Sequence, residues 1–427
     1  MNIEELYKIY LQHPSVQTDT RKLKPGDIFF ALKGPNFNGN AFAKQAIEAG
    51  AVCAVIDEKQ FEIPEKTFLV NDVLNALQAL AHHHRKKFHI PFIAITGSNG
   101  KTTTKELIHA VLSSAYKVYT TTGNLNNHIG VPLTILKIKD DADMAVIEMG
   151  ANHLHEIASY CKIAEPTHGI ITNCGKAHLE GFGSIAGVKK AKGELYDYLR
   201  KVRGTAFVMW DYDYLQEMSK GIAEIIKYGT KNADIVGTAI PSATYLTVKV
   251  DPATEIFTKL VGDYNLPNVL ATVAVARTMK ISLEKIKQAI EDYTPSNSRS
   301  QLIEKGSNKF ILDAYNANPS SMKLAVENLA GIDAQNKILM LGAMAEMGVE
   351  SEAEHENLIN LIRKYNWGNV VLVGKPFEPY KKEFTYFENA TFAAEWFEKQ
   401  KFDHSYFLIK GSRSSQMEKI LVAAGII

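Results

Sequence analysis

Short apolar runs alternate with amphipathic helical patterns along most of the chain. In the first part, the apolar runs "GDIFFAL" (26–32) and "VCAVID" (52–57) are typical of buried strands. Helical periodicity is found over 40–51 and again over 71–87, where the opening Asn-Asp pair offers helix caps. Together these elements predict a first structural block that ends near residue 85.

The central part of the chain repeats this alternation. Four apolar runs predict strands, and helical segments separate the early ones; the runs are 90–97, 144–150, 168–173 and 205–210. Strands that alternate with helices are typical of a parallel α/β sheet. From 224 to 262 the pattern changes to short alternating strands, and a helical pair over 266–292 ends this second block.

The segment "TPSNSRSQ" (294–301) is polar and contains Pro295, so we expect a linker there. After it the α/β rhythm restarts, with strands predicted at 309–315, 337–343, 369–374 and 405–411. We therefore predict an α/β fold with three domains, which cover residues 1–85, 86–295 and 296–427.

The composition limits the classes of protein that fit this pattern. The 427 residues exceed one ordinary domain, and 48 basic against 47 acidic residues leave a net charge of +1. A nucleic-acid-binding protein usually carries a basic excess, so nucleic acid is not expected as a partner. No apolar run reaches the length of a membrane span, and the charged start of the chain lacks the apolar core of a signal peptide. We expect a cytoplasmic monomer with reduced thiols at Cys53, Cys161 and Cys174.

The stretch "TGSNGKTT" (96–103) is the first with recognisable chemistry. It lies between a predicted strand and a predicted helix, and it is shorter than the common phosphate-binding loop. Its glycines permit close backbone approach to an anion, Lys101 supplies a charge for the outer phosphates, and a threonine hydroxyl can hold Mg²⁺. A phosphate-binding loop is predicted, made of Gly97, Ser98, Asn99, Gly100, Lys101, Thr102 and Thr103. The alternative is an ordinary glycine-containing turn.

Two other polar features have competing interpretations. Glu148 ends the apolar run 144–150, at the carboxyl edge where ligands of parallel sheets bind, although a solvated strand-end acid is the alternative. The run His82-His83-His84 does not place three side chains on one helix face. A solvated helix end near a domain junction is therefore predicted there rather than a metal site.

Several longer motifs, taken together and in order, carry a family resemblance. They are "TDTRKLKPGDIFFALKG" (18–34), "TGSNGKTT" (96–103), "GNLNNHIGVP" (123–132), "AVIEMGANHLHEI" (145–157), "NCGKAHLEGFGS" (173–184), "AKGELYDYL" (191–199), "LDAYNANPSSM" (312–322) and "LIKGSRSSQMEKI" (408–420). With them the chain resembles the Mur ligase superfamily over all three predicted blocks. "NLNNHIGVP" and "DAYNANP" favour the dipeptide-adding branch of these amide-forming ligases.

The resemblance implies an ATP-dependent step of peptidoglycan synthesis. ATP would phosphorylate the tripeptide carboxylate of UDP-N-acetylmuramoyl-tripeptide, and the amine of D-alanyl-D-alanine would attack the acyl phosphate, giving the pentapeptide, ADP and phosphate. ATP and Mg²⁺ are the implied cofactors. The family fold has a small N-terminal UDP-substrate domain, a central P-loop-type ATPase domain with a parallel sheet, and a C-terminal Rossmann-like domain.

The resemblance also implies roles for residues near the metal. Glu148 and the Thr102 hydroxyl would bind Mg²⁺, and His178 would bind a second metal. Lys192 stands where the family carries a carbamylated lysine, an anion that binds Mg²⁺; the "AK-x-E" context favours it over two neighbouring lysines. Without the resemblance, Lys192 would be an exposed helix lysine and His178 structural or exposed. The residues expected to serve the reaction are Lys101, His178 and Lys192.

Further contacts with the nucleotide are implied in the second and third blocks. Asn126 and Asn127 would lie by the nucleotide and metal, with a polar turn as the alternative. Arg299 would reach a phosphate as the C-terminal domain closes, and Asp313 and Asn316 would contact ATP.

Contacts with the two substrates are implied at opposite ends of the chain. Thr20 and Arg21 resemble the UDP-sugar site, where an arginine suits a pyrophosphate. Lys410 and Arg413 would hold the carboxylate of the dipeptide.

The chain departs from the family pattern in three places. Asn38-Gly39-Asn40 stands where many relatives have Asp-Gly-His, His128 where an acidic residue is common, and Ala343 where an aspartate is common. The contacts made at these positions stay open.

Three alternatives to the dipeptide ligase remain. A sister ligase would add a single amino acid to the UDP-muramoyl peptide. A P-loop NTPase that switches or pumps would keep Gly100-Lys101-Thr102 without needing "KAHLEG" or "AKGEL". A non-enzymatic sensor of UDP-sugars would bind the UDP-peptide and leave ATP intact.

Overall fold

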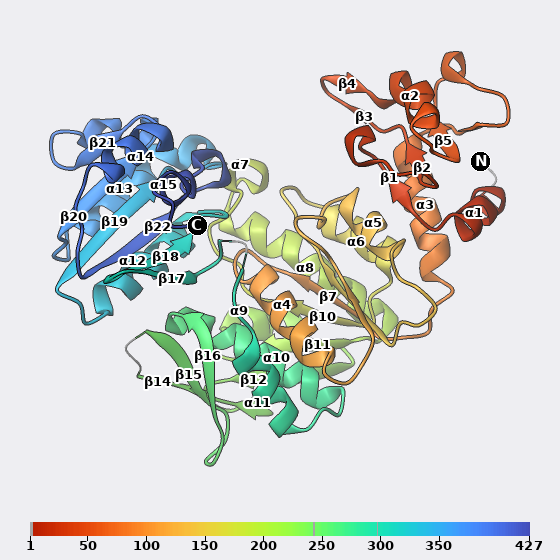
Figure 1. Ribbon diagram of the computed structural model, residues 1–427. Helices are drawn as coiled ribbons and strands as arrows, with labels where there is room; N and C mark the ends of the chain where they lie inside the picture. Colours follow the sequence, from red (N-terminus) through yellow and green to blue (C-terminus); the bar gives the residue numbers. More distant parts are fainter. Residues whose placement is uncertain (1–2, 242–243, 297) are drawn as a thin grey trace.

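Three α/β domains follow one another in the computed structural model, which describes residues 3–241, 244–296 and 298–427. In Figure 1 the N-terminal and C-terminal domains lie at opposite ends, and the central domain lies between them. Each domain has a sheet of its own, so the predicted fold class is confirmed.

The N-terminal domain is built on a four-stranded parallel sheet in the order β1-β2-β5-β6. Its strands are β1 (Val16–Gln17), β2 (Ile28–Phe30), β5 (Cys53–Ile56) and β6 (Thr67–Leu69), with the pair β3 (Lys33–Gly34) and β4 (Phe37–Asn38) apart from them. Its α-helices are α1 (Ile3–Gln12), α2 (Ala43–Glu48) and α3 (Val73–Arg85). The predicted cap of α3 is confirmed, since the Asp72 carboxylate accepts a hydrogen bond from the Asn75 N–H at 2.6 Å.

The histidine run at the end of α3 is not the solvated helix end that the sequence predicts. His84 is buried, with Nδ1 at 3.1 Å from the Tyr7 hydroxyl and Nε2 at 2.8 Å from the Ile138 carbonyl oxygen. His82 pairs with Glu165 at 2.8 Å. The prediction is wrong because partners from α1 and from the central domain cover this end of α3, while the predicted place at a domain junction is confirmed.

The central domain has a seven-stranded, fully parallel sheet in the order β13-β12-β11-β10-β7-β9-β8. The strands are β7 (Phe92–Thr96), β8 (Val118–Thr120), β9 (Met144–Glu148), β10 (His168–Ile171), β11 (Thr205–Met209), β12 (Glu224–Gly229) and β13 (Ile235–Val236). The predicted parallel sheet is confirmed. The sequence missed that β12 and β13 extend it, because their alternating polar pattern suits an edge as well as a separate sheet.

Helices cover both faces of this sheet, and a small antiparallel sheet follows it (Figure 1). The helices are α4 (Lys101–Leu112), α5 (Gly130–Ile135), α6 (Glu156–Ala164), α7 (Leu179–Phe182), α8 (Ile185–Val202), α9 (Asp213–Ser219), α10 (Leu266–Thr278) and α11 (Leu283–Asp292). The antiparallel strands are β14 (Thr238–Ile240), β15 (Tyr245–Lys249) and β16 (Glu255–Val261). The expected helical pair and short strands are thus confirmed.

The C-terminal domain has a six-stranded sheet in the order β17-β18-β22-β19-β20-β21, parallel except for β17. The strands are β17 (Gln301–Lys305), β18 (Asn308–Asp313), β19 (Asn336–Gly342), β20 (Asn369–Val373), β21 (Thr385–Phe387) and β22 (Ser405–Lys410). The helices are α12 (Pro319–Gly331), α13 (Ser351–Ile362), α14 (Ala390–Glu398) and α15 (Lys419–Ala423). Gln301 of the predicted linker already belongs to β17, and residue 297 of that linker lies outside the described residues.

The segment Asn38-Gly39-Asn40, which departs from the family pattern, is a hydrogen-bonded corner of the N-terminal domain. Asn40 is fully buried; its amide donates to Asp57 Oδ1 at 2.8 Å and its Oδ1 accepts from the Asp57 N–H at 2.9 Å. A side chain at Gly39 would collide with the backbone of the preceding strand segment. These residues therefore hold the domain's own structure together.

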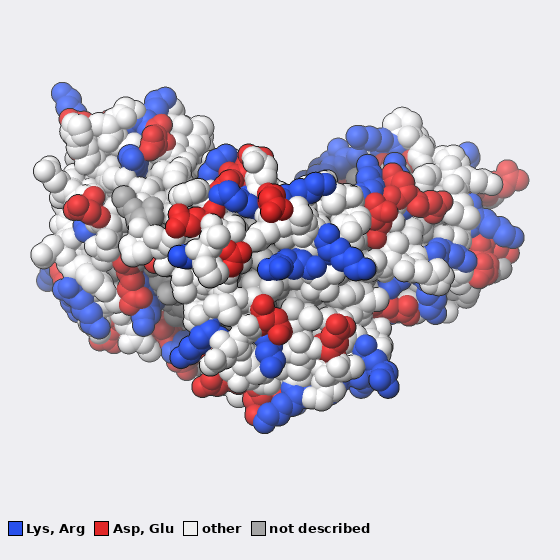
Figure 2. Space-filling model, turned by 90° about the horizontal axis from the view of Figure 1, so that it is seen from below, with Lys and Arg blue, Asp and Glu red and all other residues white. Residues whose placement is uncertain are grey.

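The surface is electrically mixed. Figure 2 shows basic and acidic side chains interspersed over the face seen from below, in line with the net charge of +1. No helix in the described parts of the chain is long and apolar enough to cross a membrane. The expected free thiols are confirmed, since Cys53, Cys161 and Cys174 are all buried and unpaired.

Candidate active site

A cavity of about 860 Å³ lies at the carboxyl edge of the central sheet. The ends of β7, β9, β10 and β11 line one side, and residues of the C-terminal domain line the other. Ligands of open α/β sheets bind at this edge. Most of the residues predicted for nucleotide and metal line this cavity: Ser98, Asn99, Gly100, Lys101, Thr102, Thr103, Asn126, Asn127, Glu148, His178, Arg299, Asp313 and Asn316. Lys410, which is predicted to hold the dipeptide carboxylate, lines it as well.

The loop between β7 and α4 is shaped by its two glycines. Gly97 and Gly100 have φ angles of 144° and 79°, and a Cβ on Gly100 would lie 2.6 Å from Asn268 Oδ1. The neighbouring loop supports it, since the Asn99 N–H donates to Asn173 Oδ1 at 3.0 Å. The open N-terminus of α4 then presents backbone N–H groups to the cavity, as an anion site requires. The phosphate-binding loop stays a prediction, which this geometry supports.

Lys101 is folded back on the loop. Its ammonium donates to the carbonyl oxygens of Gly97 at 2.6 Å and Ser98 at 3.1 Å. Burial lowers the pKa of Lys101 from 10.5 to about 8, with Arg299 lowering it further and Glu148 opposing. A bound anion would replace these weak backbone partners and keep the lysine charged.

The end of β9 presents a buried carboxylate beside the loop. Glu148 is 1 % exposed, so it is not the solvated strand-end acid of the alternative interpretation. Its Oε2 accepts from the Thr102 hydroxyl at 2.9 Å and its Oε1 from the Asn126 amide at 2.8 Å. A buried carboxyl group next to a threonine hydroxyl offers the oxygen ligands that Mg²⁺ prefers.

The residues fit Mg²⁺ bound together with phosphate oxygens better than a metal held by protein alone. Within residues 3–241, 244–296 and 298–427, no three His, Cys, Asp or Glu side chains are grouped as metal ligands. Mg²⁺ usually takes one or two carboxylates and completes its shell with water and substrate phosphates. Glu148, Thr102 and the adjacent anion loop supply that incomplete set.

Lys192 lies just behind the cavity and is buried on α8, contrary to the exposed helix lysine suggested by its local pattern. Its Nζ donates to the Ala151 carbonyl oxygen at 3.2 Å and lies 5.2 Å from the centre of the Phe182 ring. Among the described residues no carboxylate lies within ion-pair distance of it. Burial, and next the charge of Lys101, lower the pKa of Lys192 from 10.5 to about 7.

His178 lies on the loop that follows β10. Its Nδ1 faces the carboxylate of Glu346, which comes from the C-terminal domain. The neighbouring His178 side chain lowers the pKa of Glu346. A second ion pair joins the same loop to the C-terminal domain: Lys176 Nζ lies 2.6 Å from Glu354 Oε1.

The C-terminal domain contributes the opposite wall of the cavity. Arg299 stacks on the Tyr315 ring, 3.8 Å from its centre. Lys410 is buried in an ion pair with Asp313, so these two predicted residues are joined to each other. Pro319 opens α12 as the sequence suggests, and the cap residue Asn318 donates from Nδ2 to Asn99 Oδ1 at 2.7 Å. This bond ties the phosphate loop to the C-terminal domain.

Besides Lys192, four predicted residues do not line this cavity. Gly97 lies behind the loop, where it accepts from Lys101. Thr20 and Arg21 lie in the N-terminal domain, and Arg21 is paired with Asp19 at 2.8 Å. Arg413 lies at the end of β22, largely exposed, 5.8 Å from the centre of the Tyr315 ring.

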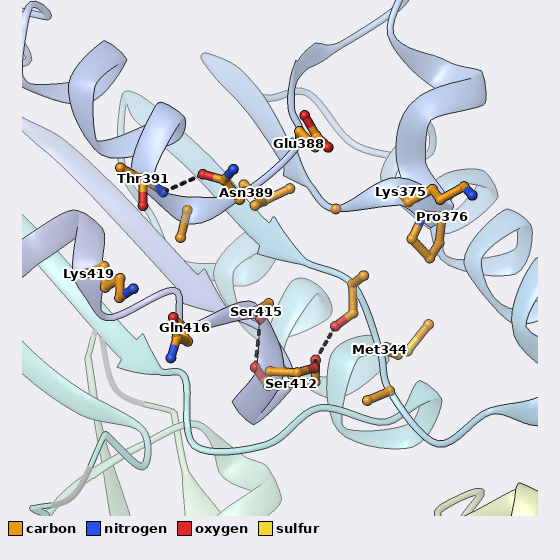
Figure 3. Close-up of a pocket in the computed structure, with 16 residues that line it drawn as sticks. Met344, Lys375, Pro376, Glu388, Asn389, Thr391, Ser412, Ser415, Gln416 and Lys419 are labelled. Atoms are coloured by element: carbon orange, nitrogen blue, oxygen red, sulfur yellow. Dashed lines mark hydrogen bonds between the residues drawn. The ribbon is translucent and has the colours of Figure 1, made fainter.

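A second, smaller crevice of about 230 Å³ lies within the C-terminal domain, at the carboxyl ends of β19, β20 and β22 (Figure 3). The departure at Ala343 lines it, so the crevice lacks the acid that is common at that position. Lys375 and Lys419 lie at its rim, and no ion pair is found for either in the described chain. The Asn389 cap of α14 and the Ser412 hydroxyl, which donates to the Ala343 carbonyl oxygen at 2.6 Å, complete a polar lining.

His128, another departure from the family pattern, is exposed and lines the larger cavity, and its carbonyl oxygen accepts from Gln78 Nε2 at 3.0 Å.

The sequence-based predictions missed residues that support the site. Asn268 accepts from the Thr104 hydroxyl at 3.1 Å, and it is a polar residue within the otherwise apolar helix α10, which was an available signal. The contacts of Lys176 with Glu354 had no such signal, because they join residues 178 positions apart.

Comparison with known proteins covers most of the chain. Three family profiles match it: Mur ligase family, catalytic domain (residues 14–87), Mur ligase middle domain (95–276), and Mur ligase, glutamate ligase domain (298–413). The UDP-N-acetylmuramoyl-tripeptide–D-alanyl-D-alanine ligase of Haemophilus influenzae is 34% identical over 96% of this chain and 93% of its own length. The enzyme of that name from Escherichia coli is 37% identical over 84% of this chain and 81% of its own.

Solved structures agree with these sequence matches. MurF from Acinetobacter baumannii superimposes with a TM-score of 0.87 at 30% identity, covering 96% of this chain and 93% of its own. MurF ligase from Thermotoga maritima, solved in complex with ADP, gives a TM-score of 0.86 at 25% identity over 97% of both chains. The chain therefore belongs to the Mur ligases, in the family of UDP-N-acetylmuramoyl-tripeptide–D-alanyl-D-alanine ligases, MurF.

Proposed function

We propose that the protein joins D-alanyl-D-alanine to UDP-N-acetylmuramoyl-tripeptide at the expense of ATP, giving UDP-N-acetylmuramoyl-pentapeptide, ADP and phosphate in peptidoglycan synthesis. The observation that carries the proposal is one cavity in which the phosphate loop, the buried Glu148 and the His178 loop face residues of the C-terminal domain. Ligation needs such a shared site because ATP, a carboxylate and an amine must meet without water. A switch or pump would need no buried lysine behind the site.

The chemistry has two steps. A carboxylate oxygen of the tripeptide attacks the γ-phosphorus of ATP and ADP leaves, which forms an acyl phosphate. The neutral amine of D-alanyl-D-alanine then attacks the acyl carbon, phosphate leaves with the C–O bonding pair, and a proton is released from nitrogen. Catalysis depends on positioning the groups and on neutralising charge, as for other phosphoryl transfers.

The chain's own residues supply most of that neutralisation. The loop Ser98–Thr103 would hold the phosphates on its backbone N–H groups, with Lys101 released from its carbonyl partners to contact the outer phosphates. Glu148 and the Thr102 hydroxyl would hold Mg²⁺, which supplies charge neutralisation between the phosphates and the carboxylate when it is bound. Asn126, Asn127, Arg299, Asp313 and Asn316 would complete the nucleotide site from both domains. The Thermotoga maritima relative was solved in complex with ADP, which supports an adenine nucleotide as ligand.

Lys192 and His178 would serve the second metal. The lowered pKa of Lys192 makes a neutral amine available, and only a neutral amine reacts with CO₂ to give a carbamate and a proton. A carbamate would also replace a buried, unpaired cation by an anion suited to Mg²⁺. His178 would bind through Nε2, since Nδ1 faces Glu346.

The two other substrates would approach from opposite domains. Thr20 and Arg21 in the N-terminal domain would contact the UDP part. Arg413, which is largely exposed after β22, would reach the dipeptide carboxylate. Lys410 is buried in its pair with Asp313, so it would instead hold the wall of the cavity in place. We propose domain limits of 1–85, 86–295 and 296–427, and a monomer that acts in the cytoplasm, where ATP and UDP-linked precursors are available.

The test is phosphate release with Mg-ATP, UDP-N-acetylmuramoyl-tripeptide and D-alanyl-D-alanine, each omitted in turn. We expect release only when all three are present, together with a product heavier by the dipeptide less water. Release with single amino acids in place of the dipeptide would make the protein a sister ligase. Release that needs neither carboxylate nor amine would overturn the proposal in favour of another NTPase.

A further inference from the structure

The loop that carries His178 is held by two acidic residues of the C-terminal domain. Glu346 faces His178 Nδ1, and Glu354 accepts from Lys176 Nζ at 2.6 Å. The Glu354 side chain is only 7% exposed, and Lys176 of the central domain is its ion-pair partner across the domain contact.

Backbone contacts join the same two segments. The Lys176 N–H donates to the Ser320 hydroxyl at 3.1 Å, and the Glu180 N–H approaches the Glu346 carbonyl oxygen at 3.4 Å. Figure 1 shows α7, which begins directly after His178, beside the C-terminal domain. The loop is therefore fitted to the C-terminal domain along several residues.

Both residues of the His178–Glu346 contact have an uncommon backbone. His178 has φ of 52° and Glu346 has φ of 59°, in the left-handed region that residues other than glycine rarely adopt. Such conformations persist where the surroundings determine them, and they cluster at functional sites. The strain lies on both sides of the contact between the domains.

The contact decides which imidazole nitrogen faces the cavity. Nδ1 is turned to the Glu346 carboxylate of the C-terminal domain, which leaves Nε2 as the ring nitrogen that can bind a metal. A ligand histidine is usually oriented in this way, by a carboxylate on its other nitrogen. Here that carboxylate belongs to a different domain from the histidine.

We propose that Glu346 is a positioning residue that orients His178 for metal binding only when the C-terminal domain is closed, with the Lys176–Glu354 pair anchoring the loop. The inference rests on the proposed function. Closure thereby completes the reaction centre at the same time as it brings in the C-terminal wall, so phosphoryl transfer does not begin in the open enzyme.

The first test replaces Glu346 and measures metal binding apart from turnover. In Glu346→Gln we expect the affinity for Mn²⁺ in the presence of ADP, followed by electron paramagnetic resonance, to fall by about 10–100-fold, as for other residues that orient a metal ligand. kcat should fall by a similar factor while KM for ATP changes little. Glu350→Gln, an exposed acid on the same segment, is the matched control and should behave as wild type. Full Mn²⁺ affinity and full kcat in Glu346→Gln would overturn the proposal.

The second test exchanges the charges of the anchoring pair. Lys176→Glu and Glu354→Lys should each lose kcat, and the double variant should regain most of it, because the pair is restored across the domain contact. If Glu354→Lys fails to fold, Glu354→Gln replaces it, since it removes the charge while keeping the size of the side chain, and it should also lose kcat. Exchanging Arg363 and Glu383, a pair at 2.6 Å within the C-terminal domain, should leave kcat unchanged. If wild type forms the amide but the double variant has no higher kcat than the single variants, the Lys176–Glu354 pair does not anchor the loop. If wild type forms no amide, the proposed function itself is wrong.

Discussion

Burial is the main cause that lowers the pKa of both Lys101 and Lys192. The two lysines nevertheless have different hydrogen-bond partners. Lys101 has two carbonyl oxygens and faces the cavity, whereas Lys192 has one carbonyl oxygen and lies behind it. Each pKa is lowered partly by the charge of a second cation. Lys101 is therefore placed to bind an anion in the cavity. Lys192 is placed to react as a neutral amine and form a carbamate.

Lys101→Ala removes the only lysine of the phosphate loop. We expect turnover to be abolished, with kcat lower by at least ~10²–10³-fold, the range found when one group that stabilises transition-state charge is removed. Coupled measurement of ADP formation at saturating substrates checks this. Lys220→Ala, at an exposed position beyond α9, is the control and should keep wild-type kcat. A Lys101→Ala enzyme with near-normal kcat would exclude the assigned role.

Lys192→Ala tests the carbamate. The variant should be inactive, because no anion then faces the second metal, and short carboxylates such as formate or acetate should restore part of the activity by entering the space left by the side chain. The measurement is kcat against carboxylate concentration. Full activity without any added carboxylate would refute the carbamate.

The residues predicted from motifs and those found only in the structure differ in one physical respect. Glu148, Thr102 and Lys101 belong to local strand–loop–helix patterns, and the cavity brings them together as expected. The pairings of Glu346 with His178 and of Asn268 with Thr104 join distant segments, and such pairings leave no periodicity in the sequence. Their conformations are set by tertiary packing.

At the scale of elements, α12 links helix capping to the phosphate loop. Asn318 accepts from the Ser321 N–H at 3.0 Å to cap α12, and its Nδ2 donates to Asn99 across the domain contact. One side chain therefore stabilises a helix of the C-terminal domain and positions a loop of the central one.

Two substitutions separate these roles. Asn318→Ala should cost about 1 kcal/mol of stability through loss of the cap, whereas Asn318→Ser keeps a capping hydroxyl but cannot reach Asn99. In Asn318→Ser we expect an unchanged Tm and a KM for ATP raised roughly fivefold, the equivalent of one hydrogen bond of about 1 kcal/mol. Thermal unfolding and initial rates provide the two readouts. A wild-type KM for ATP in Asn318→Ser would mean that the cap alone matters and that the bond to Asn99 does not position the loop.

The elements that the sequence predicted are those with buried, continuous apolar runs, such as β7, β9 and β19. The ones it missed or misplaced lie at sheet edges. β17 and β21 are only partly buried, and β12 and β13 extend the central sheet at its edge. Edge strands have one solvent side and short pairing, so their pattern is not distinct from that of a loop.

At the scale of the whole molecule, buried histidines make stability depend on pH. Burial is the largest cause that holds the pKa values of His84, His109, His168 and His355 below 6.5. Below pH 6.5 the unfolded chain therefore binds more protons than the folded one, so the free energy of unfolding falls as the pH falls. Above about pH 6.5 these histidines are neutral in both the folded and the unfolded chain, so the free energy of unfolding no longer changes with their protonation.

His84 connects this effect to the domain arrangement, because it joins α3 to α1 and to the Ile138 segment of the central domain. We expect denaturant midpoints to be constant from pH 8 to 7 and to fall below about pH 6.5, with a slope of up to about 1.4 kcal/mol per pH unit for each proton involved. His84→Gln, which keeps hydrogen-bonding capacity without a titrating ring, should have a shallower slope, whereas His89→Gln, at an exposed position, should match wild type. The same slope in His84→Gln and wild type would show that the junction between the first two domains does not sense pH, and that the remaining buried histidines carry the effect.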